Sequence, residues 1–558
     1  MEFFKRASGE NKHHLLIGHI THIFNRVLRG GYPKAWSVST IVPVPKPKGD
    51  SDNMDDYRGI TVGVSLSKLY SLVLLRRMDE WAEKNGFRAR GQAGFRYGKG
   101  TSDNAFVLNH IIEKYKIKKK AVYSAFIDFR KAYDSIDRSN LWKALRSFGV
   151  GGDILDTLIA MYTDVRMRVR LGGEMGTEFE SAQGVKQGDP LSPLLFGLFI
   201  DRFEKVLAEN LPDLGVELRS VCLKLLLYAD DLVLLAESKH DLQRLLCALE
   251  DFCSTNGLTV NVKKSEAVTF NRHECADHEP ALTYLDKELV VKSEFSYLGM
   301  QFHETSGMKV AWERGLEKGR KAYFAMMRRL YELKLNNIHL RSFLFDALVR
   351  PILAYGSEIW GPVAMQGAQS TAASVAVEKL HMSFLGQSLG VRQQTSVAIL
   401  MNELDRTPIN LFWLRQILRF WNKICARGDT DLVYMAMCES CELARAGSKK
   451  VWAAHVIKIL GRLGFHNIVT QYTQPFPFIT NIETVLSRAE EVWRDSIRGI
   501  CIEPTTITVP SVKHSIVHAV PDCEHRGFRW LTYSLWFSPH NEDKVSRFYS
   551  YSYSYSYS

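Results

Sequence analysis

Two adjacent aspartates interrupt an apolar stretch of this chain, Lys224-Leu-Leu-Leu-Tyr-Ala-Asp-Asp-Leu-Val-Leu-Leu-Ala236. The aliphatic blocks on either side have the length and composition of buried strands, and the polar centre predicts a tight turn between them. Burying an unpaired carboxylate costs several kcal/mol, so Asp230 and Asp231 need either solvent or a counter-charge. A solvated hairpin tip and a divalent-cation site, for which carboxylate oxygens are hard ligands, both satisfy this requirement.

The composition is that of a globular protein with an excess of basic residues. The 558 residues are 46% hydrophobic and 24% charged, which is enough apolar material for roughly two to four domains. Lys and Arg exceed Asp and Glu by 72 to 61, a net charge of +11, and this balance favours nucleic acid as a partner. The chain shows no signal peptide, no membrane-spanning apolar run and no disulfide framework among its nine cysteines. We therefore expect an intracellular protein, nuclear or cytoplasmic, that does not associate with a membrane.

Hydrophobic periodicity predicts an alternation of helices and strands. In the first half we expect a helix over 1–29, a hairpin of strands over 37–46 and 57–62, helices over 66–84 and 102–115, a basic Gly-rich loop over 91–101 and a strand over 121–128. In the second half we expect helices over 141–164, a hairpin over 167–179, a helix from Pro193, a helix over 241–256 capped by Gly257, strands over 258–270 and 294–302, and helices from 308 to about 438.

Strands that end on acids recur in this pattern. Asp128 closes one apolar strand, and Asp230 and Asp231 occupy a hairpin tip 102 positions later (230 − 128). Three carboxylates on neighbouring strands suit two divalent cations that activate a 3′-hydroxyl and brace a leaving pyrophosphate. Lys46 and Arg58, on the first hairpin, suit a triphosphate clamp, although two solvated strand-end cations are by themselves the more common explanation.

Seven ordered motifs carry a resemblance to a known family. They are Tyr57-Arg-Gly-Ile, Gln92-Ala-Gly-Phe-Arg96, Phe126-Ile-Asp-Phe-Arg-Lys-Ala-Tyr-Asp134, Gln187-Gly-Asp-Pro-Leu-Ser-Pro193, Tyr228-Ala-Asp-Asp231, Gly257-Leu-Thr-Val-Asn-Val-Lys-Lys-Ser265 and Phe295-Ser-Tyr-Leu-Gly299. Their order and spacing resemble the fingers and palm motifs of reverse transcriptases, in the variety found in non-LTR (LINE-type) retrotransposons. The segment Tyr355-Gly-Ser-Glu-Ile-Trp360 extends the resemblance, which covers roughly residues 1–389.

The resemblance implies a role for each matched position. Asp128, Asp230 and Asp231 would bind two Mg²⁺ ions, with Mn²⁺ as a substitute, and Lys264 would protonate the leaving pyrophosphate. Tyr133 matches the aromatic residue that blocks a ribose 2′-hydroxyl. The resemblance also implies nucleotide contacts from Lys46, Arg58, Gln187 and Gly188. It implies a primer grip formed by Phe295, Tyr297, Leu298 and Gly299. A plain surface lysine at 264 and a plain core aromatic at 133 remain open, and Asp134 and Asp189 are interpreted as local hydrogen-bonding acids.

Some features of the family are missing. We find neither the basic finger segment that usually precedes this region nor an endonuclease pattern, so we expect a polymerase core cut from a larger ancestral reading frame. Cys438 and Cys441 lack a second pair at metal spacing, and the group His514, His518, Cys523 and His525 is irregular, which does not favour zinc. The Tyr-Ser repeat over 549–558 is expected to be disordered.

We predict an α+β right-hand polymerase that copies RNA into DNA, with an RNA template, a DNA primer, dNTPs and Mg²⁺ as partners. The expected domains are N-terminally truncated fingers (1–120), palm (121–303), helical thumb (304–365) and helical C-terminal extension (366–548). One rival is an inactive or host-recruited nucleic-acid-binding relic; others are an intron-encoded splicing maturase and an RNA-copying RNA polymerase, which Tyr133 disfavours. The sequence carries no signal of an oligomeric state.

Overall fold

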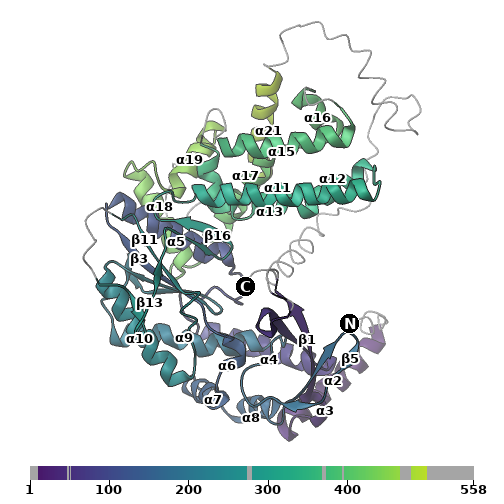
Figure 1. Cartoon of the computed structure of the whole chain (residues 1–558), viewed down its shortest axis with the longest axis vertical. Coiled ribbons are helices and arrows are strands. Elements are labelled where there is room, and N and C mark those ends of the chain that lie inside the picture. Colours follow the sequence, from purple (N-terminus) through teal and green to yellow (C-terminus); the bar gives the residue numbers. More distant parts are fainter. Residues whose placement is uncertain are drawn as a thin grey trace. The chain divides into compact units, whose positions relative to one another are not determined.

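The computed structural model describes residues 10–46, 50, 52–272, 280–366, 372–391, 395–465, 479 and 481–498. The chain divides into two compact units, which are described separately (Figure 1). Unit 1 comprises Met1–Asn104 with Lys118–Ser293, and unit 2 comprises Ala105–Ile117 with Glu294–Ser558. Within the described ranges, no helix combines the length and apolarity needed to cross a membrane.

A five-stranded sheet in unit 1 contains the aspartates. Its order is β14 (Val290–Val291), β11 (Glu266–Phe270), β3 (Val122–Ile127), β10 (Asp231–Ala236) and β9 (Leu225–Tyr228). β3 pairs antiparallel with both β10 and β11, and β10 pairs antiparallel with β9. The two aliphatic blocks around Asp230 are thus adjacent strands of one hairpin, as the sequence predicts, and their leucines are fully buried.

Two amphipathic helices, α9 (Ser192–Asn210) and α10 (Lys239–Asn256), share a hydrophobic core with this sheet. α9 begins with Pro193 in its first turn, where a missing N–H costs least. The Ser238 hydroxyl caps α10 by accepting the Asp241 N–H at 3.0 Å, and Gly257 ends it in the left-handed region at φ 72°. The predicted helix start at Pro193 and stop at Gly257 are confirmed, and α10 begins at Lys239, two residues before its predicted start at 241.

A second sheet in unit 1 is built on the predicted first hairpin. Its order is β2 (Tyr57–Val62), β1 (Val38–Pro45), β4 (Arg166–Leu171) and β5 (Glu174–Met175), with β6 (Phe179–Glu180) paired to β4. β1 and β2 pair antiparallel, and β4 lies parallel to β1. The accompanying helices are α2 (Glu10–Gly30), α3 (Lys34–Ser37), α4 (Ser65–Lys84), α7 (Arg138–Ser147) and α8 (Gly152–Tyr162). The predicted helix over 1–29 is therefore confirmed from Glu10 onward.

Two predicted strands differ from the structure. The strand expected over 258–270 begins only at Glu266, because the preceding residues form a turn in which Asn261 accepts the backbone N–H groups of Lys264 and Ser265. The single strand expected over 294–302 is a hairpin of β15 (Glu294–Tyr297) and β16 (Met300–His303). Leu298 and Gly299 reverse it with φ of 48° and 79°, the positive values that a two-residue type I′ turn requires.

Unit 2 is mostly helical, with α5 (Thr101–Ile117) packed into its core from residue 105 on. Phe106 of α5 lies edge-to-face with Trp452 of α19 (Trp452–Arg462), with ring centroids 5.0 Å apart. His110 Nε2 and Lys114 Nζ both reach the Glu439 carboxylate of α18 (Leu432–Arg445), at 2.8 and 2.7 Å. The other helices include α11 (Lys309–Glu332), α12 (Ile338–Leu348), α13 (Arg350–Ala354), α14 (Ser357–Ala364), α15 (Ala372–Leu389), α16 (Val397–Glu403), α17 (Ile409–Cys425) and α21 (Ile482–Arg498).

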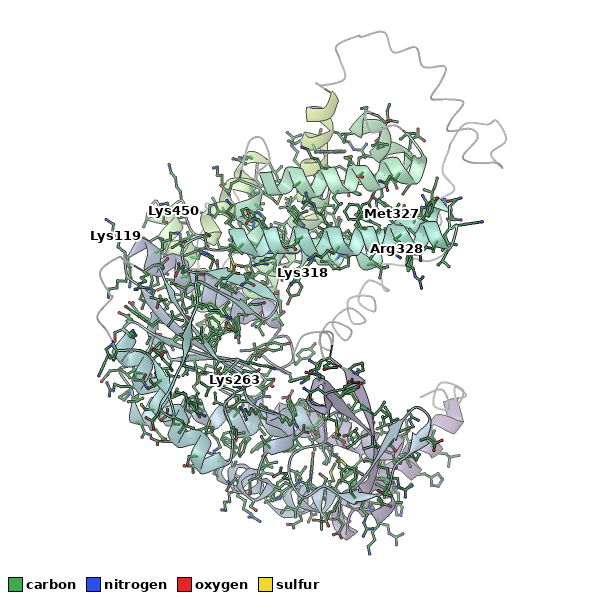
Figure 2. All side chains as sticks on the ribbon, viewed as in Figure 1. Lys119, Lys263, Lys318, Met327, Arg328 and Lys450 are labelled. Atoms are coloured by element: carbon green, nitrogen blue, oxygen red, sulfur yellow. The ribbon has the colours of Figure 1, made fainter. Side chains whose placement is uncertain are left out.

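One helix of unit 2 presents an exposed cationic surface. Lys318 and Arg328 extend from α11, and Figure 2 labels both side chains. The opposite side of α11 is apolar, where Tyr323, Met326 and Leu330 are buried. Because buried positions recur every three to four residues and charged positions lie between them, α11 is an amphipathic helix with one solvent-exposed face.

The cysteines in the described part of the chain are free, and they include the pair at 438 and 441. Cys438 and Cys441 are buried in α18, and no group of metal-ligating side chains forms around them within the described ranges. The irregular His/Cys group at 514–525 and the Tyr-Ser repeat at 549–558 lie outside the described residues.

Candidate active site

The pairing of β3 with β10 brings Asp128 opposite Asp231. The last paired residues of this ladder are Ile127 and Leu232, and Asp128 and Asp231 are the next residue on each strand. Residues directly opposite each other on antiparallel strands have Cα atoms about 4.5–5.5 Å apart. Asp230 precedes Asp231 in the turn that joins β9 to β10. Three carboxylates from distant sequence positions therefore meet at one end of the sheet.

The electrostatics of the cluster are those of crowded carboxylates. Burial raises the pKa of Asp231 to about 7, and the negative charges of Asp230 and Asp128 add to the rise. Burial also raises the pKa of Asp230, with Asp128 contributing in the same direction and Arg58 opposing it. Buried carboxylates that lie close to other negative charges are stabilised by a cation placed among them.

A turn after α10 fixes the orientation of Asp128. The Asn261 side-chain amide donates to Asp128 Oδ2 at 3.0 Å, and the Asn261 backbone N–H donates to the Asp128 carbonyl at 2.7 Å. The Asp128 backbone N–H in turn donates to the Ser265 hydroxyl at 3.1 Å. Sequence reasoning missed both residues as parts of the site, because 133 and 137 positions separate them from Asp128 and neither belongs to a local pattern of acids.

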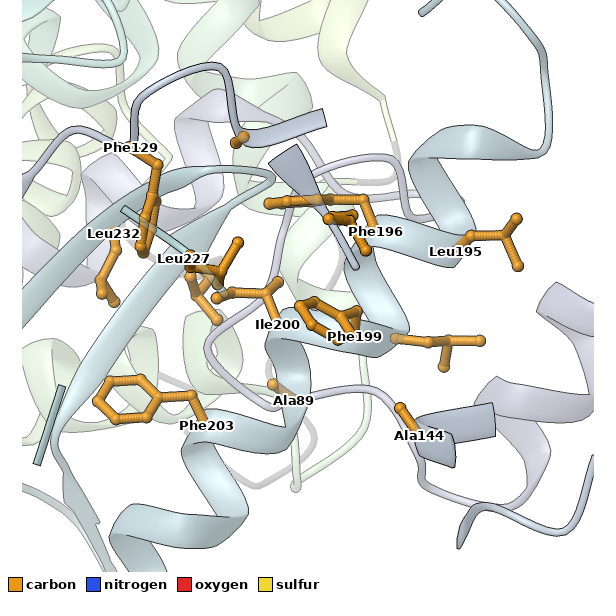
Figure 3. Packing of buried hydrophobic residues seen from close by; sticks show 14 of the residues in the cluster. Ala89, Phe129, Ala144, Leu195, Phe196, Phe199, Ile200, Phe203, Leu227 and Leu232 are labelled. Carbon is orange, nitrogen blue, oxygen red and sulfur yellow. The ribbon is translucent and has the colours of Figure 1, made fainter. Parts of the chain in front are cut away.

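The core of α9 supports the turn between β9 and β10. Figure 3 shows Phe196, Phe199 and Phe203 on α9 and Leu227 and Leu232 on the two strands that flank the turn. All five side chains are at most 1% exposed. Since rings and leucines fill the space below the strands, the turn that carries Asp230 and Asp231 rests on a closely packed base.

The predicted nucleotide contacts gather on β2 and on the loop before α9. Arg58 lies on β2 opposite Val44 and is close enough to Asp230 to lower that carboxyl's pKa. The Gln187 carbonyl accepts the Thr61 N–H of β2 at 2.7 Å, which ties the loop to the same strand. Lys46 follows β1, and its backbone N–H donates to the Asp56 carbonyl at 2.8 Å.

Gly188 is required at its position by two independent constraints. Its φ of +105° is a conformation that L side chains rarely adopt, and a Cβ built on it would lie 2.9 Å from the Thr61 carbonyl oxygen. The close approach of the Gln187–Gly188 loop to β2 therefore depends on a glycine.

Tyr133 lies on the short helix α6 (Ala132–Ser135), and its ring stacks on Phe196 with centroids 4.7 Å apart and planes 18° apart. Its carbonyl accepts the Val185 N–H at 2.8 Å, so α6 adjoins the loop that carries Gln187. The half-buried ring is thus packed on the core and remains partly accessible. This placement accommodates both the predicted contact with a nucleotide sugar and the alternative of a packing role.

Lys264 is exposed in the turn that contains Asn261, and its backbone N–H donates to the Asn261 carbonyl at 2.9 Å. Lys263, labelled in Figure 2, is its exposed neighbour. The turn thus carries both the residue that orients Asp128 and, three positions later, the predicted proton donor.

The predicted primer grip belongs to unit 2. Phe295 and Tyr297 lie on β15, and Leu298 and Gly299 form its turn. The Tyr355 hydroxyl donates to the Leu298 carbonyl at 2.7 Å, and a Cβ on Gly299 would lie 3.1 Å from the Tyr355 ring. The segment around Tyr355, which the sequence linked to the same resemblance, therefore supports this hairpin directly.

The carboxylate set suits metal ions that are completed by a substrate. Across the described residues, no three His, Cys, Asp or Glu side chains form a ready-made group for one ion. Mg²⁺ in polymerase sites is held by one or two carboxylates together with substrate phosphates and water, so a closed protein cage is not expected. The raised pKa values of Asp230 and Asp231, which burial and neighbouring carboxylates cause, are the observation that fits cations there.

A family model described as reverse transcriptase (RNA-dependent DNA polymerase) matches residues 44–302, which include the three aspartates, all of their sheet and the second sheet from the end of β1 onward. Residues 44–302 are similar to the reverse transcriptase family. The match and the sheet order confirm the predicted α+β fold of a right-hand polymerase.

Curated relatives identify the kind of reverse transcriptase. The chain is 31% identical over 271 residues to a Pol polyprotein of retrotransposable element R2 from Popillia japonica, covering 46% of this chain and 43% of the relative. It is 27% identical over 357 residues to the RNA-directed DNA polymerase of mobile element jockey from Drosophila melanogaster, covering 61% and 37%. The predicted non-LTR retrotransposon type is therefore confirmed. The chain spans less than half the length of these relatives.

Among solved structures, the chain is similar to a Candida albicans telomerase described in complex with a fragment of telomeric RNA. The sequences are 10% identical, the alignment covers 67% of this chain and 66% of the telomerase, and the TM-score is 0.38.

Proposed function

We propose that this chain is an RNA-directed DNA polymerase that extends a DNA primer with dNTPs on an RNA template. The observation that carries the proposal is the meeting of Asp128, Asp230 and Asp231 at the end of β3 and β10, inside the region matched by the reverse transcriptase family. The elevated pKa of Asp231, about 7, supports a site built for cations.

The three aspartates are the proposed ligands of two Mg²⁺ ions, which Mn²⁺ can replace. When bound, these ions would supply a more acidic primer 3′-hydroxyl and neutralise charge on the triphosphate. Asp128, whose carboxylate accepts the Asn261 amide, and the two aspartates of the turn are proposed to supply the oxygen ligands once a nucleotide and the ions are bound. Positioning of this kind, with electrostatic stabilisation, supplies most of the catalysis in phosphoryl transfer.

The remaining residues act on the nucleotide and the primer. Arg58 and Lys46 are proposed to bind the triphosphate, and Gln187 and Gly188 to contact the incoming nucleotide and the template. Arg58 suits the role because a guanidinium near Asp230 can pair two phosphate oxygens at once. Tyr133 is proposed to exclude a ribose 2′-hydroxyl, which selects dNTPs over NTPs.

Two further roles complete the proposal. Lys264, exposed in the same turn as Asn261, is proposed to protonate the leaving pyrophosphate. The hairpin with Phe295, Tyr297, Leu298 and Gly299 is proposed to hold the primer end, supported from below by Tyr355.

Primer extension tests the proposal directly. The purified chain is supplied with a DNA primer on an RNA template, dNTPs and Mg²⁺, beside Asp230→Asn/Asp231→Asn and Asp128→Asn variants. Asp156→Asn, at an exposed position of α8, is the matched control. We expect extension by the wild type and the control, and a loss of at least about 1,000-fold in the aspartate variants, since charge stabilisation worth several kcal/mol is removed.

Each other outcome has a definite meaning. No extension by the wild type with intact binding of template and primer, in Mg²⁺ and in Mn²⁺, would support the nucleic-acid-binding relic. Extension by the aspartate variants at the wild-type rate would refute the assignment of the carboxylates. Incorporation of NTPs in preference to dNTPs would favour an RNA polymerase and remove the role proposed for Tyr133.

A further inference from the structure

The loop at 91–95 is hydrogen-bonded to the strand that leads into the turn with Asp230 and Asp231. Leu227 exchanges hydrogen bonds with this loop: its N–H donates to the Gly91 carbonyl, and its carbonyl accepts the Ala93 N–H, each at 2.9 Å. A Cβ built on Gly94 would lie 2.2 Å from the Ala229 nitrogen. The two backbones therefore approach so closely that only a glycine fits at position 94.

Gln92 makes the side-chain connection between this loop and the turn. Its Oε1 accepts the Ala229 N–H and the Gly94 N–H, both at 2.9 Å. Its Nε2 donates to the Asp201 carboxylate of α9 at 3.0 Å. Gln92 is fully buried, so each of these bonds is made in a medium of low dielectric and is costly to leave unmade.

The far end of the connection is anchored by a buried ion pair. Arg88 Nε donates to the other oxygen of Asp201 at 2.8 Å, and both side chains are at most 1% exposed. Gly197 of α9 makes room for this arginine, because a Cβ there would lie 2.9 Å from a guanidinium nitrogen. Removing one partner from such a pair leaves a buried charge uncompensated, so Asp201 is a fixed point for the Gln92 amide.

Ala229 is the residue that most needs support. Its φ of 57° lies in the left-handed region, which costs a non-glycine residue about 1 kcal/mol or more unless the surroundings hold it. Its N–H is the group bonded by Gln92, and the next residue is Asp230. A change in this backbone conformation would therefore redirect both carboxylates.

We propose that Gln92 is a positioning residue of the active site: its amide joins the Ala229 N–H to Asp201 and so fixes the turn that aims Asp230 and Asp231. The inference rests on the proposed polymerase function for its catalytic consequence. It also has a consequence independent of activity, because loss of the Gln92 amide exposes the Ala229 N–H to exchange with solvent.

Three variants separate positioning from folding. Gln92→Met keeps the length of the side chain and removes all three bonds. Gln92→Glu keeps the acceptors but sets a second carboxylate against Asp201. The double variant Gln92→Glu/Asp201→Asn reverses that bond: the new amide at 201 donates to the new carboxylate at 92 and still accepts from Arg88, with the net charge of the wild type restored.

We measure single-turnover extension with Mg²⁺ titration, binding of template and primer, and hydrogen exchange of the 225–236 segment. For Gln92→Met and Gln92→Glu we expect kcat about 10- to 100-fold lower, a higher Mg²⁺ requirement and unchanged template binding. Gln92→Met also loses the acceptor of the Ala229 N–H, so we expect exchange at Ala229 at least about 10-fold faster in this variant. The double variant is expected to recover at least about 10-fold in kcat over Gln92→Glu.

The control is Ser124→Ala, which removes a buried hydrogen bond of 2.7 Å to the Val268 carbonyl within the same sheet, away from the turn. It is expected to lower the melting temperature without changing kcat or the exchange at Ala229. Wild-type kcat in Gln92→Met, wild-type exchange at Ala229, or no recovery in the double variant would each overturn the inference. If the wild type itself does not extend primers, the proposed function fails, and the exchange measurement still decides the role of Gln92.

Discussion

Asn261 donates two hydrogen bonds to Asp128: its side-chain amide donates to Oδ2 at 3.0 Å and its backbone N–H donates to the carbonyl at 2.7 Å. Through these bonds the turn that follows α10 fixes a carboxylate that follows β3. The same turn presents Lys264, the proposed proton donor, three residues later. A movement of this turn would therefore change the aim of a metal-binding oxygen and the position of the acid together.

Replacing Asn261 by alanine is expected to lower kcat by about 10-fold or more and to raise the Mg²⁺ concentration needed for half-maximal extension. A hydrogen bond to a charged group contributes about 1.5–3 kcal/mol, and each 1.36 kcal/mol corresponds to about a factor of ten in rate. Steady-state extension over a Mg²⁺ series measures both effects. Asn256→Ala is the control, because the Asn256 amide is buried but donates to the Phe252 carbonyl. Equal losses in the two variants would mean that Asn261 matters only for folding.

The sequence predicts the reacting groups of this site better than the groups that hold them. Asp128, Asp230 and Asp231 each end or interrupt an apolar strand. A charged residue next to a run of apolar residues stands out in the sequence alone. The hairpin around Asp230 and the caps of α10 were predictable for the same reason, since each depends on residues that are neighbours in the chain.

The residues that support the aspartates do not stand out from their sequence neighbours. Asn261, Ser265 and Asp201 are ordinary polar residues whose partners lie more than 100 positions away, so only the folded chain reveals their roles. The misplaced strand boundary near Glu266 has the same origin. Its preceding segment reads as extended, but tertiary hydrogen bonds to Asp128 draw it into a turn. The sequence does not predict the hairpin at Leu298, because leucine is not a typical turn residue and adopts its positive φ only in the folded turn.

Gly188→Ala is expected to destabilise the fold by about 1–3 kcal/mol and to raise the KM for dNTPs. The new Cβ would lie 2.9 Å from the Thr61 carbonyl oxygen in a backbone with φ of +105°, so the loop with Gln187 must withdraw from β2. Thermal melting and dNTP titration measure the two effects. Gly172→Ala is the control, with φ of +60° and no atom within 4 Å, and it is expected to cost about 1 kcal/mol with no change in KM. An unchanged KM in Gly188→Ala would separate this loop from nucleotide binding.

Exposed cations on α11 are expected to contact nucleic-acid phosphates. Lys318→Gln/Arg328→Gln should reduce the slope of log K for template and primer against log salt by about 1 to 2, since each phosphate contact contributes about 0.7–0.9. Fluorescence anisotropy at several salt concentrations gives the slope. Lys143→Gln/Lys205→Gln, on exposed positions of α7 and α9, removes the same charge and is expected to leave the slope unchanged. If both pairs reduce it equally, binding responds to net charge and not to α11.

The raised pKa of Asp231 makes the metal-free protein less stable at alkaline pH. Its pKa is about 7 in the folded chain against 3.8 for an unperturbed group, so between these values the folded state binds the extra proton. The stability from that proton is fully present below about pH 4 and is lost as pH rises through about 7. Asp231→Asn, which stays neutral, is therefore expected to exceed the wild type by about 1–3 kcal/mol at pH 8 and to match it near pH 4.

Metal binding should reverse this order. Mg²⁺ replaces the lost proton as the counter-charge, so it is expected to raise the melting temperature of the wild type at pH 8 by a few degrees and to leave Asp230→Asn/Asp231→Asn unchanged. Below pH 7 protons compete with the metal, and the Mg²⁺ affinity should fall by up to about tenfold per pH unit. Melting curves at pH 4, 6 and 8, with and without Mg²⁺, measure all three effects. Equal stability of the wild type and Asp231→Asn at pH 8 without metal would show that neither burial nor the neighbouring carboxylates disfavour the charged form of Asp231, and the electrostatic basis for a cation site at this turn would be lost.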